Sequence, residues 1–547
     1  MNSLVVNPKE LTGLRLNVAD HFLDRHLREG RGGCLAIAGV GPPVTYAELA
    51  ERANRVGAAW RELGVGAGER VLLVLPDSPE FIACFFGTVK IGAVAVPVNP
   101  FTRAADYAYY AADSQPCLAV VHASSFPEAL PALGHAQPTP RLLTVDGRAA
   151  GCDGLEELLA RSSGRLAAHP TTADDIAFFL YTSGSGGQPK AAMHRHRHML
   201  VAADSFARQV LGFGPDDVAF SASKLFFAYG LGNAMYFPLS VGAASVLLPE
   251  RPTPEKIFGV LERHRPSLFF AVPTIYGALL RAAEGSSRRL DFLRAAVSAG
   301  EALPVEIFAR FRQRFKQEIL DGIGTTEMLH MFISNRPGQA RPGSCGQVVP
   351  GYRARIVADS GGDAAAGELG NLWVEGGSAF AGYWGKPELT ARVKPACGTG
   401  RQQEWVITGD KFYSDADGYY HYGGRTDDML KVAGQWVSPM EVENALLAHA
   451  AVAEAAVVGQ RDPDGLTQIT AYVVLCQLGT GSGDEGVFQP SSSACGAASG
   501  SHSELAEHLR AFVRQRLPGY KCPQRFEFVA ELPKTATGKI QRFKLRT

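Results

Sequence analysis

A loop rich in glycine and hydroxyl side chains follows an apolar run at residues 176–180 and ends at Lys190. Its sequence from residue 181 is YTSGSGGQPK. A strand that leads into such a loop exposes backbone N–H groups and hydroxyls where phosphate oxygens could bind, and Lys190 adds a positive charge. The loop is not a Walker motif, because Pro189 precedes the lysine and Ala191 follows it. Taken alone, a loop of this composition is more often a simple turn.

Two further segments place carboxylates where nucleotide chemistry would need them. Residues 321–328, DGIGTTEM, set two hydroxyls and the Glu327 carboxylate after glycines, which suits Mg²⁺ beside a phosphate. A threonine just before this glutamate would equally suit a capped helix start. At residues 407–410, Asp410 comes straight after an apolar strand end, where it could accept hydrogen bonds from ribose hydroxyls or simply serve as a turn residue.

Two segments toward the end of the chain complete the pattern. Residues 424–439, GRTDDMLKVAGQWVSP, lie at an expected domain boundary, and residues 533–539, PKTATGK, place Lys539 directly after a glycine on a loop. A lysine near the end of a chain is usually just solvated. Each of the five segments is a weak signal alone, but their occurrence together in one order is informative.

In order, spacing and the closing P-K-T-x-T-G-K, the sequence resembles the acyl-adenylate-forming superfamily of acyl-CoA synthetases, non-ribosomal peptide adenylation domains and luciferases. The resemblance covers nearly the whole chain. Residues 97–101, 224–233 and 326–330 look most like the benzoate-CoA ligases. The resemblance implies an ATP-dependent aryl carboxylate-CoA ligase, which activates the acid as an acyl-adenylate with MgATP, releases pyrophosphate, and then forms a thioester with coenzyme A and releases AMP.

The resemblance also implies a role for each residue that matches a motif of the superfamily. The β- and γ-phosphates would be held by Thr182, Ser183, Gly184, Ser185, Gly187 and Lys190. Adenine would lie among Ala299, Gly300, Glu301, Asp321, Gly322 and Ile323, and the ribose would be bound by Asp410 and Arg425. Glu327 would hold Mg²⁺, Thr326 would contact the α-phosphate, and Lys539 would bridge the attacking carboxylate and that phosphate. A small C-terminal domain would swing about Asp427 between the two half-reactions, which brings Lys431 and Gly434 toward the pantetheine of coenzyme A.

The acid itself would enter a flat, mostly apolar slot suited to an aryl ring. This slot would be lined by Phe226, Ala228, Tyr229, Gly324, His330 and Met331. Phe226 could instead simply pack in the core. No pair of cations is present for a dicarboxylate, but hydroxybenzoates, aminobenzoates or a fatty acid stay open as substrates. A carrier-protein arm in place of coenzyme A also stays open, as does a nucleotide-binding sensor without catalysis.

One position departs from the superfamily pattern. Related proteins usually carry threonine where this chain has Gly186, so one hydroxyl that would face phosphate is missing. Slower adenylation or weaker ATP binding could follow, although the backbone N–H groups remain.

The elements expected to position these residues alternate between strand-like and helix-like segments. Helical periodicity at residues 46–63 and 80–91 alternates with apolar runs at 70–75 and 93–98, which predicts parallel sheet with crossover helices. We therefore predict an α/β fold. A large body, rich in parallel sheet, spans residues 1–425 and a small, mobile α+β domain spans residues 426–547, with a flexible Gly/Ser-rich insertion near 477–503.

Composition excludes several other classes of protein. Of 547 residues, 46% are hydrophobic and 20% charged, and 54 basic residues balance 54 acidic ones, which fits neither a disordered chain nor a polybasic nucleic-acid binder. The nine cysteines include no C-x-x-C pair, so neither a disulfide framework nor a zinc site is indicated. No run resembles a signal peptide or a membrane span. We expect a cytoplasmic enzyme, as a monomer or homodimer.

Overall fold

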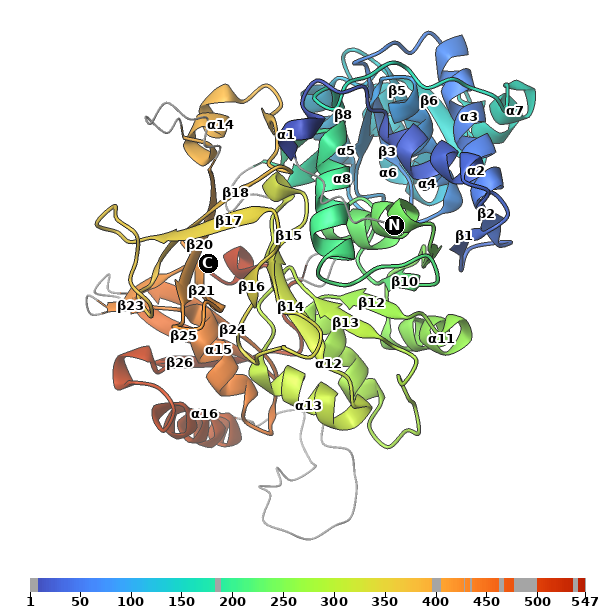
Figure 1. Cartoon of the computed structure of the whole chain (residues 1–547). Helices are drawn as coiled ribbons and strands as arrows, with labels where there is room; N and C mark the ends of the chain where they lie inside the picture. Colours follow the sequence, from blue (N-terminus) through green and yellow to red (C-terminus); the bar gives the residue numbers. More distant parts are fainter. Residues whose placement is uncertain are drawn as a thin grey trace.

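The computed structural model describes residues 8–182, 188–395, 405–426, 428–432, 435–461, 467–476, 499–534 and 540–546. It has an α/β fold with a large N-terminal part and a smaller C-terminal domain (Figure 1). Three sheets form the large part, and the C-terminal domain contains two small sheets of its own. Among the helices within these ranges, none is both long and apolar enough to cross a membrane.

The first sheet is parallel except at one edge. Across the sheet its strands are β19 (Gly382–Tyr383), β9 (Lys190–Arg195), β8 (Ile176–Thr182), β4 (Val94–Pro97), β3 (Arg70–Val74), β5 (Leu118–His122), β6 (Arg141–Val145) and β7 (Asp153–Gly154). Only β19 and β9 pair antiparallel to their neighbours. The accompanying helices are α3 (Tyr46–Glu62), α4 (Pro79–Lys90), α5 (Ala104–Ser114), α6 (Phe126–Gly134) and α7 (Leu155–Arg161). Central strands such as β3 are apolar along most of their length because both faces of the sheet are covered.

The second sheet repeats this architecture. Across it lie β16 (Gln347–Val348), β15 (Met331–Ser334), β14 (Ile319–Gly324), β13 (Ala295–Ser298), β12 (Leu268–Ala271), β10 (Val218–Ser221), β11 (Ala244–Val246), β1 (Leu35–Ala38) and β2 (Val44–Thr45). Its crossover helices are α11 (Pro254–His264), α12 (Pro273–Ala282) and α13 (Val305–Phe315). The parallel strands β12, β13 and β14 end at one edge, which is where ligands bind in open α/β sheets.

The third sheet is antiparallel and contains β17 (Tyr352–Val357), β18 (Gly370–Gly376), β20 (Val406–Ser414) and β21 (Tyr420–Arg425). The helix α14 (Pro387–Val393) precedes β20 along the chain. Figure 1 shows this sheet next to β15 and β16 and above the C-terminal domain.

The C-terminal domain has its own hydrophobic core. Its elements are β22 (Leu430–Val432), β23 (Gln435–Val437), α15 (Pro439–Leu447), β24 (Val452–Arg461), β25 (Thr467–Leu475), α16 (Ser499–Arg514), β26 (Arg525–Phe528) and the short 3₁₀ helix η7 (Arg542–Leu545). Val437, Leu446, Val457, Ile469 and Leu509 are fully buried together in this core.

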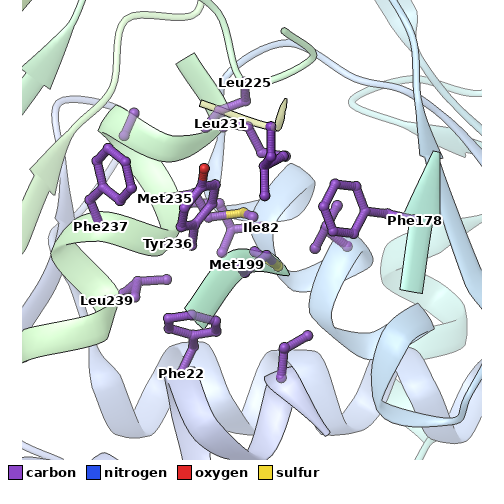
Figure 2. Close-up of a cluster of buried hydrophobic side chains, with 14 of the residues drawn as sticks. Phe22, Ile82, Phe178, Met199, Leu225, Leu231, Met235, Tyr236, Phe237 and Leu239 are labelled. Atoms are coloured by element: carbon purple, nitrogen blue, oxygen red, sulfur yellow. The ribbon is translucent and has the colours of Figure 1, made fainter. Parts of the chain in front are cut away.

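A core of large side chains joins the first two sheets behind the predicted acid slot. Figure 2 shows Phe22, Ile82, Met199 and Tyr236 converging, and all four are completely buried. They come from η1 (Asp20–Asp24), α4, α8 (His196–Ala202) and η4 (Gly232–Tyr236). Because protein interiors are close-packed, this core fixes the position of η4 and of the α9 turn (Ala228–Leu231) that precedes it.

Most predicted segments are present, and two predictions need correction. The helix α16 begins at Ser499, so the final residues of the expected Gly/Ser-rich loop at 477–503 are helical, and the His502 ring stacks on Phe528 at 4.8 Å. Residues 477–498 lie outside the described residues. Asp410 lies inside β20 rather than after its end, because the strand continues past a distortion at Gly409, whose φ is +74°.

Candidate active site

Lys190 and Glu327, two residues predicted to act on phosphate and metal, both contact one tyrosine. Thr182 and Lys190 face each other as the last and first residues of the antiparallel strands β8 and β9, so they fix both ends of the loop between them. Lys190 Nζ lies 5.6 Å from the centre of the Tyr383 ring, and the Tyr383 hydroxyl donates to Glu327 Oε1 at 2.5 Å. The lysine, the tyrosine and the predicted Mg²⁺ ligand therefore form one continuous cluster. A strand rather than a helix follows the loop, so no helix dipole contributes there.

The two residues predicted to contact phosphate and metal share a short 3₁₀ turn, η5 (Thr326–Met328). Thr325 caps the turn by accepting from the Met328 N–H at 3.3 Å, so the helix-cap interpretation of this segment is also correct. Phe380 N–H donates to the Glu327 carbonyl at 2.7 Å. These bonds fix the backbone on which Thr326 and Glu327 are presented.

His194 supports the same turn from β9. Its Nε2 lies 2.9 Å from the Thr326 carbonyl oxygen, which can only accept, so Nε2 carries the proton. Burial lowers the pKa of His194 to about 3, so the ring is neutral at physiological pH. The adjacent His198 Nδ1 accepts from the Arg195 N–H at 3.2 Å. The histidine is thus a fixed donor that positions Thr326.

Asp113 at the end of α5 ties the end of the glycine-rich loop to the strand that carries Tyr383. Its carboxylate accepts from the Tyr181 hydroxyl at 2.9 Å and pairs with Lys386, and its carbonyl accepts from Trp384 Nε1 at 3.0 Å. Tyr109 on the same helix donates to the Pro189 carbonyl at 2.6 Å. These contacts hold the residues on either side of Lys190 and Tyr383.

The two segments predicted to enclose adenine lie side by side. Ser298 at the end of β13 and Asp321 on β14 are register partners in neighbouring parallel strands. The chain turns away after Ser298 through Gly300, whose φ of +90° lies in a region that L side chains rarely adopt. Ala299 is buried and Glu301 half-buried on this turn. The structure thus brings Ala299, Gly300 and Glu301 to the same edge as Asp321, Gly322 and Ile323.

Asp321 is buried, and its environment favours the neutral acid. Burial raises its pKa to about 8, and its Oδ1 has no hydrogen-bond partner among the residues that the structure describes. Cys345 Sγ lies 3.9 Å from Oδ2. Burial raises the pKa of the Cys345 thiol well above its usual range, and the nearby Asp321 and Asp410 add to the shift. The predicted adenine and ribose carboxylates therefore both lie close to one thiol.

The predicted ribose-binding pair forms directly. Asp410 and Arg425 are register partners on β20 and β21, and Arg425 Nη1 lies 3.2 Å from Asp410 Oδ1. The same nitrogen donates to the Thr408 carbonyl at 3.1 Å. A Cβ at Gly409 would lie 3.0 Å from Arg425 Nη2, so this glycine leaves room for the guanidinium.

The predicted acid slot is built around an aromatic pair. The Tyr229 and His330 rings lie 5.5 Å apart, and the Tyr229 hydroxyl donates to the Val297 carbonyl at 3.1 Å. Burial lowers the pKa of His330 to about 3, so this ring is also neutral. A Cβ at Gly324 would lie 2.5 Å from the His330 carbonyl oxygen, so only glycine lets β14 and β15 approach here. Met331 is buried as the first residue of β15, and Ala228 is half-buried beside Tyr229.

Phe226 lies in the core, whereas Phe227 next to it is only half-buried. The segment before them is anchored by a buried ion pair in which Lys224 Nζ lies 3.7 Å from Asp77 Oδ2. The Asp77 carboxylate also accepts from the Leu225 N–H at 2.9 Å. This anchor fixes the strand-to-helix connection that carries the aromatic residues of the slot.

The C-terminal domain contacts the segment predicted to enclose adenine through the residue that follows Lys539. The Ile540 N–H donates to Glu301 Oε1 at 3.2 Å. Several predicted residues lie outside the described residues: Ser183, Gly184, Ser185, Gly186, Gly187, Asp427, Gly434 and Lys539, together with the side chain of Lys431.

Sequence reasoning missed Tyr383, His194 and Asp113. Tyr383 lies far along the chain from Glu327, and no local pattern marks it. The three histidines at 194, 196 and 198 are a visible signal just after Lys190, but their spacing does not reveal that one of them binds the Thr326 carbonyl.

Among the described residues, no three His, Cys, Asp or Glu side chains cluster as a self-contained metal site. A lone carboxylate such as Glu327 suits Mg²⁺ that arrives with a nucleotide, because this ion is commonly bound by one or two carboxylates together with substrate phosphates.

The fold and the site together define a nucleotide-dependent enzyme, and comparison with known proteins identifies its class. The sequence profile of the AMP-binding enzyme family matches residues 29–384, and that of the AMP-binding enzyme C-terminal domain matches residues 441–539. The chain belongs to the AMP-binding enzyme family.

Within this family, the chain is similar to several ligases of aromatic acids. A benzoate–CoA ligase of Thauera aromatica is 45% identical over 97% of this chain and 96% of its own length. The solved structure of a benzoate CoA ligase from Burkholderia xenovorans LB400 is 40% identical, covers 97% of this chain and 100% of its own, and superposes with a TM-score of 0.86. An anthranilate CoA ligase in complex with anthranoyl-AMP is 36% identical, covers 99% and 98%, and has a TM-score of 0.89.

Proposed function

We propose that this protein is an ATP-dependent aryl carboxylate–CoA ligase with benzoate as its preferred acid. The family and the benzoate– and anthranilate–CoA ligases among its relatives support this class of reaction. The observation that carries the proposal is the order of partners along residues 321–327. Asp321 lies beside Ser298, Gly324 beside His330, and Glu327 beside Tyr383. The proposed adenine, acid and metal sites would thus lie along one short segment, where the carboxylate of a bound acid could meet the α-phosphate of a bound nucleotide.

In the first half-reaction, a carboxylate oxygen of the acid attacks the α-phosphorus of ATP. The new O–P bond forms as the bond to the bridging oxygen breaks, and pyrophosphate leaves with its electron pair. A bare carboxylate needs this activation because a thiol that attacks it must add charge to a group that is already anionic. In our proposal Lys190 neutralises charge on the β- and γ-phosphates, the Thr326 hydroxyl donates to the α-phosphate, and Lys539 stabilises the charge that develops between acid and phosphate.

In the second half-reaction, the sulfur of coenzyme A adds to the acyl carbonyl and the C–O bond to AMP breaks. AMP leaves with the electron pair and the thiol proton passes to solvent. We propose that the C-terminal domain swings about Asp427 between the two steps, which withdraws Lys539 and presents Lys431 and Gly434 to the pantetheine arm.

Glu327 would hold Mg²⁺ in this scheme, and the ion would neutralise phosphate charge when bound. The Tyr383 hydroxyl aims the Glu327 carboxylate, and Asp410 with Arg425 would bind the ribose hydroxyls. ATP and coenzyme A are both needed, so we propose that the enzyme works in the cytoplasm. It would work as a monomer or a homodimer.

The test is the release of pyrophosphate and AMP with MgATP and coenzyme A across a panel of acids. The panel contains benzoate, hydroxybenzoates, aminobenzoates, phenylacetate and a medium-chain fatty acid. The proposal predicts turnover that depends on an acid and is strongest with benzoate. A preference for the fatty acid would be consistent with adenylation but would contradict the assignment of the acid slot to an aryl ring. Nucleotide binding without any pyrophosphate release would mean that the protein is a nucleotide-binding sensor and not a ligase.

A further inference from the structure

We propose that Asp113 and Tyr109 on α5 are positioning residues for the binding of ATP, and that they act from the opposite face of the sheet. The inference rests on the proposed function, since it needs Lys190 to bind the β- and γ-phosphates and Tyr383 to orient the Glu327 carboxylate. It extends the site to a helix that lies behind the strands that carry these residues.

The register of β8, β9 and β19 places three site residues on one face of the first sheet. Thr182 is paired with Lys190, and Tyr383 is paired with Ala192, which lies two residues after Lys190 on β9. Side chains directly opposite each other in an antiparallel pair share a face, and so do residues two apart along a strand. Thr182, Lys190 and Tyr383 therefore point to the same side of the sheet.

The chain neighbours of these residues point to the other side, where α5 lies. The ring of Tyr181 lies 4.6 Å from that of Tyr110 on α5. The ring of Trp384 lies 5.2 Å from that of Phe179 on β8. Phe179 and Tyr110 belong to one buried hydrophobic cluster, whereas Tyr383 belongs to another. The sheet thus separates α5 from the three site residues.

Asp113 links two of these neighbours. Its carboxylate accepts from the Tyr181 hydroxyl at 2.9 Å, and its backbone carbonyl accepts from Trp384 Nε1 at 3.0 Å. The carboxylate also pairs with Lys386, and its side chain is only 11% exposed. Hydrogen bonds to a charged group are stronger than those between neutral groups. Asp113 therefore holds the end of β8 and the segment after β19 at a fixed separation.

Tyr109, one turn earlier on α5, holds the start of β9. Its hydroxyl donates to the Pro189 carbonyl at 2.6 Å, and Pro189 directly precedes Lys190. The helix thus bonds one chain neighbour of each of the three site residues. Loss of these bonds should disturb the position of Lys190 relative to Tyr383, whose ring centre lies 5.6 Å from the lysine nitrogen.

The acid slot is built on other elements. Tyr229 lies on α9 and His330 directly precedes β15, which belongs to the second sheet. The contacts of α5 described above all reach the first sheet or the segment after β19. A change on α5 should therefore weaken the binding of ATP and leave the binding of the acid nearly intact.

The experiment compares Asp113→Ala, Asp113→Asn and Tyr109→Phe in the full chain. Tyr110→Phe is the matched control for the tyrosine, because Tyr110 lies on the same helix and its hydroxyl makes no hydrogen bond to any residue that the structure describes. Glu388→Gln is the control for the carboxylate, since Glu388 is exposed on α14, two residues after Lys386.

Two quantities are measured for each protein. The first is the pair of KM values for MgATP and benzoate, obtained from pyrophosphate release in the presence of coenzyme A. The second is the rise in Tm that MgATP produces without any acid, which reports nucleotide binding independently of turnover.

We expect Asp113→Ala to raise the KM for MgATP about ten- to one-hundredfold, because hydrogen bonds to a charged group are lost. Tyr109→Phe should raise it about three- to tenfold, because one bond between neutral groups is lost. The KM for benzoate should change less than about twofold in both variants, since its site is separate. Asp113→Asn keeps an acceptor for the Tyr181 hydroxyl and should recover part of the loss. The rise in Tm should shrink in the same order, and both controls should match the wild type.

Equal increases in the two KM values would overturn the inference, because they would mean that α5 only supports the fold. An unchanged KM for MgATP in Tyr109→Phe would overturn it as well, and this variant keeps its ring, so it tests the inference even where Asp113→Ala does not fold. Wild-type protein that releases no benzoate-dependent pyrophosphate would instead contradict the proposed function, so the two failures are distinct.

Discussion

Replacing Tyr383 with phenylalanine removes a single hydrogen bond and leaves its surroundings intact. The lost bond runs from the Tyr383 hydroxyl to Glu327 Oε1 at 2.5 Å. Burial raises the pKa of Tyr383 above its usual range and the Glu327 carboxylate adds to the shift, so the phenol stays protonated and donates at all assay pH values. The ring remains in the variant, and so does its packing on Phe380 at 4.8 Å.

The expected size of the effect follows from the role of this hydrogen bond, which orients the Glu327 carboxylate. A hydrogen bond to a charged group contributes about 1.5–3 kcal/mol, and each 1.36 kcal/mol is about tenfold in rate or affinity. The Glu327 backbone stays fixed by the Phe380 N–H, so only the orientation of its carboxylate is lost. Since we assign Mg²⁺ binding to that carboxylate, the apparent Mg²⁺ concentration for half-maximal activity should rise about ten- to one-hundredfold.

The assay is benzoate-dependent pyrophosphate release titrated with Mg²⁺ at constant ATP, together with the rise in Tm that MgATP produces in each protein. Tyr520→Phe is the control, because Tyr520 is exposed in the C-terminal domain. The control should titrate as the wild type does. If Tyr383→Phe shows the same Mg²⁺ dependence and the same MgATP-induced rise in Tm as the wild type, the assignment of Glu327 as an aimed metal ligand is refuted.

Three other perturbations test separate parts of the structure. His194→Ala removes the donor to the Thr326 carbonyl and should slow adenylation roughly tenfold. Because the pKa of His194 is about 3, the variant should keep the shape of the rate profile between pH 6 and 8. An altered shape would contradict the assignment of His194 as a neutral donor. Asp321 has its folded pKa raised to about 8 from 3.8, so the folded state keeps a proton that the unfolded chain releases, and stability falls as pH rises from about 4 to 8. Asp321→Asn should therefore gain in Tm relative to the wild type between pH 5.5 and 8, with no further gain above that, whereas a constant difference would refute the shift. Lys224→Met leaves the buried Asp77 without its cation and should cost about 3–5 kcal/mol in urea unfolding, most of which the double variant with Asp77→Asn should recover. A single variant as stable as the wild type would show that the pair anchors nothing.

The sequence predicts best where local signals suffice. The helix predicted at residues 46–63 spans Tyr46–Glu62 in the structure, because Thr45 and Glu48 cap its start and its apolar residues recur at helical spacing. The meeting of Ser298 and Asp321 is also predictable, since neighbouring parallel strands end at a common edge.

Contacts that depend on tertiary structure could not be predicted in this way. Asp410 was expected after a strand end, but the positive φ of Gly409 lets β20 continue through it. Tyr383 meets Glu327 from a strand 56 residues away, and Ile540 meets Glu301 across 239 residues. Neither composition nor periodicity carries information about such pairs, which exist only because separate sheets and a second domain bring them together.

The central claim is that this protein activates an aryl acid as its adenylate before thioester formation. The most direct measurement incubates the protein with benzoate and MgATP without coenzyme A, identifies the products by mass spectrometry, and then adds coenzyme A. We predict benzoyl-AMP and pyrophosphate in the first stage and conversion of the adenylate to benzoyl-CoA and AMP in the second. Benzoyl-CoA that forms with ADP and phosphate, or an adenylate that coenzyme A does not consume, would contradict the claim.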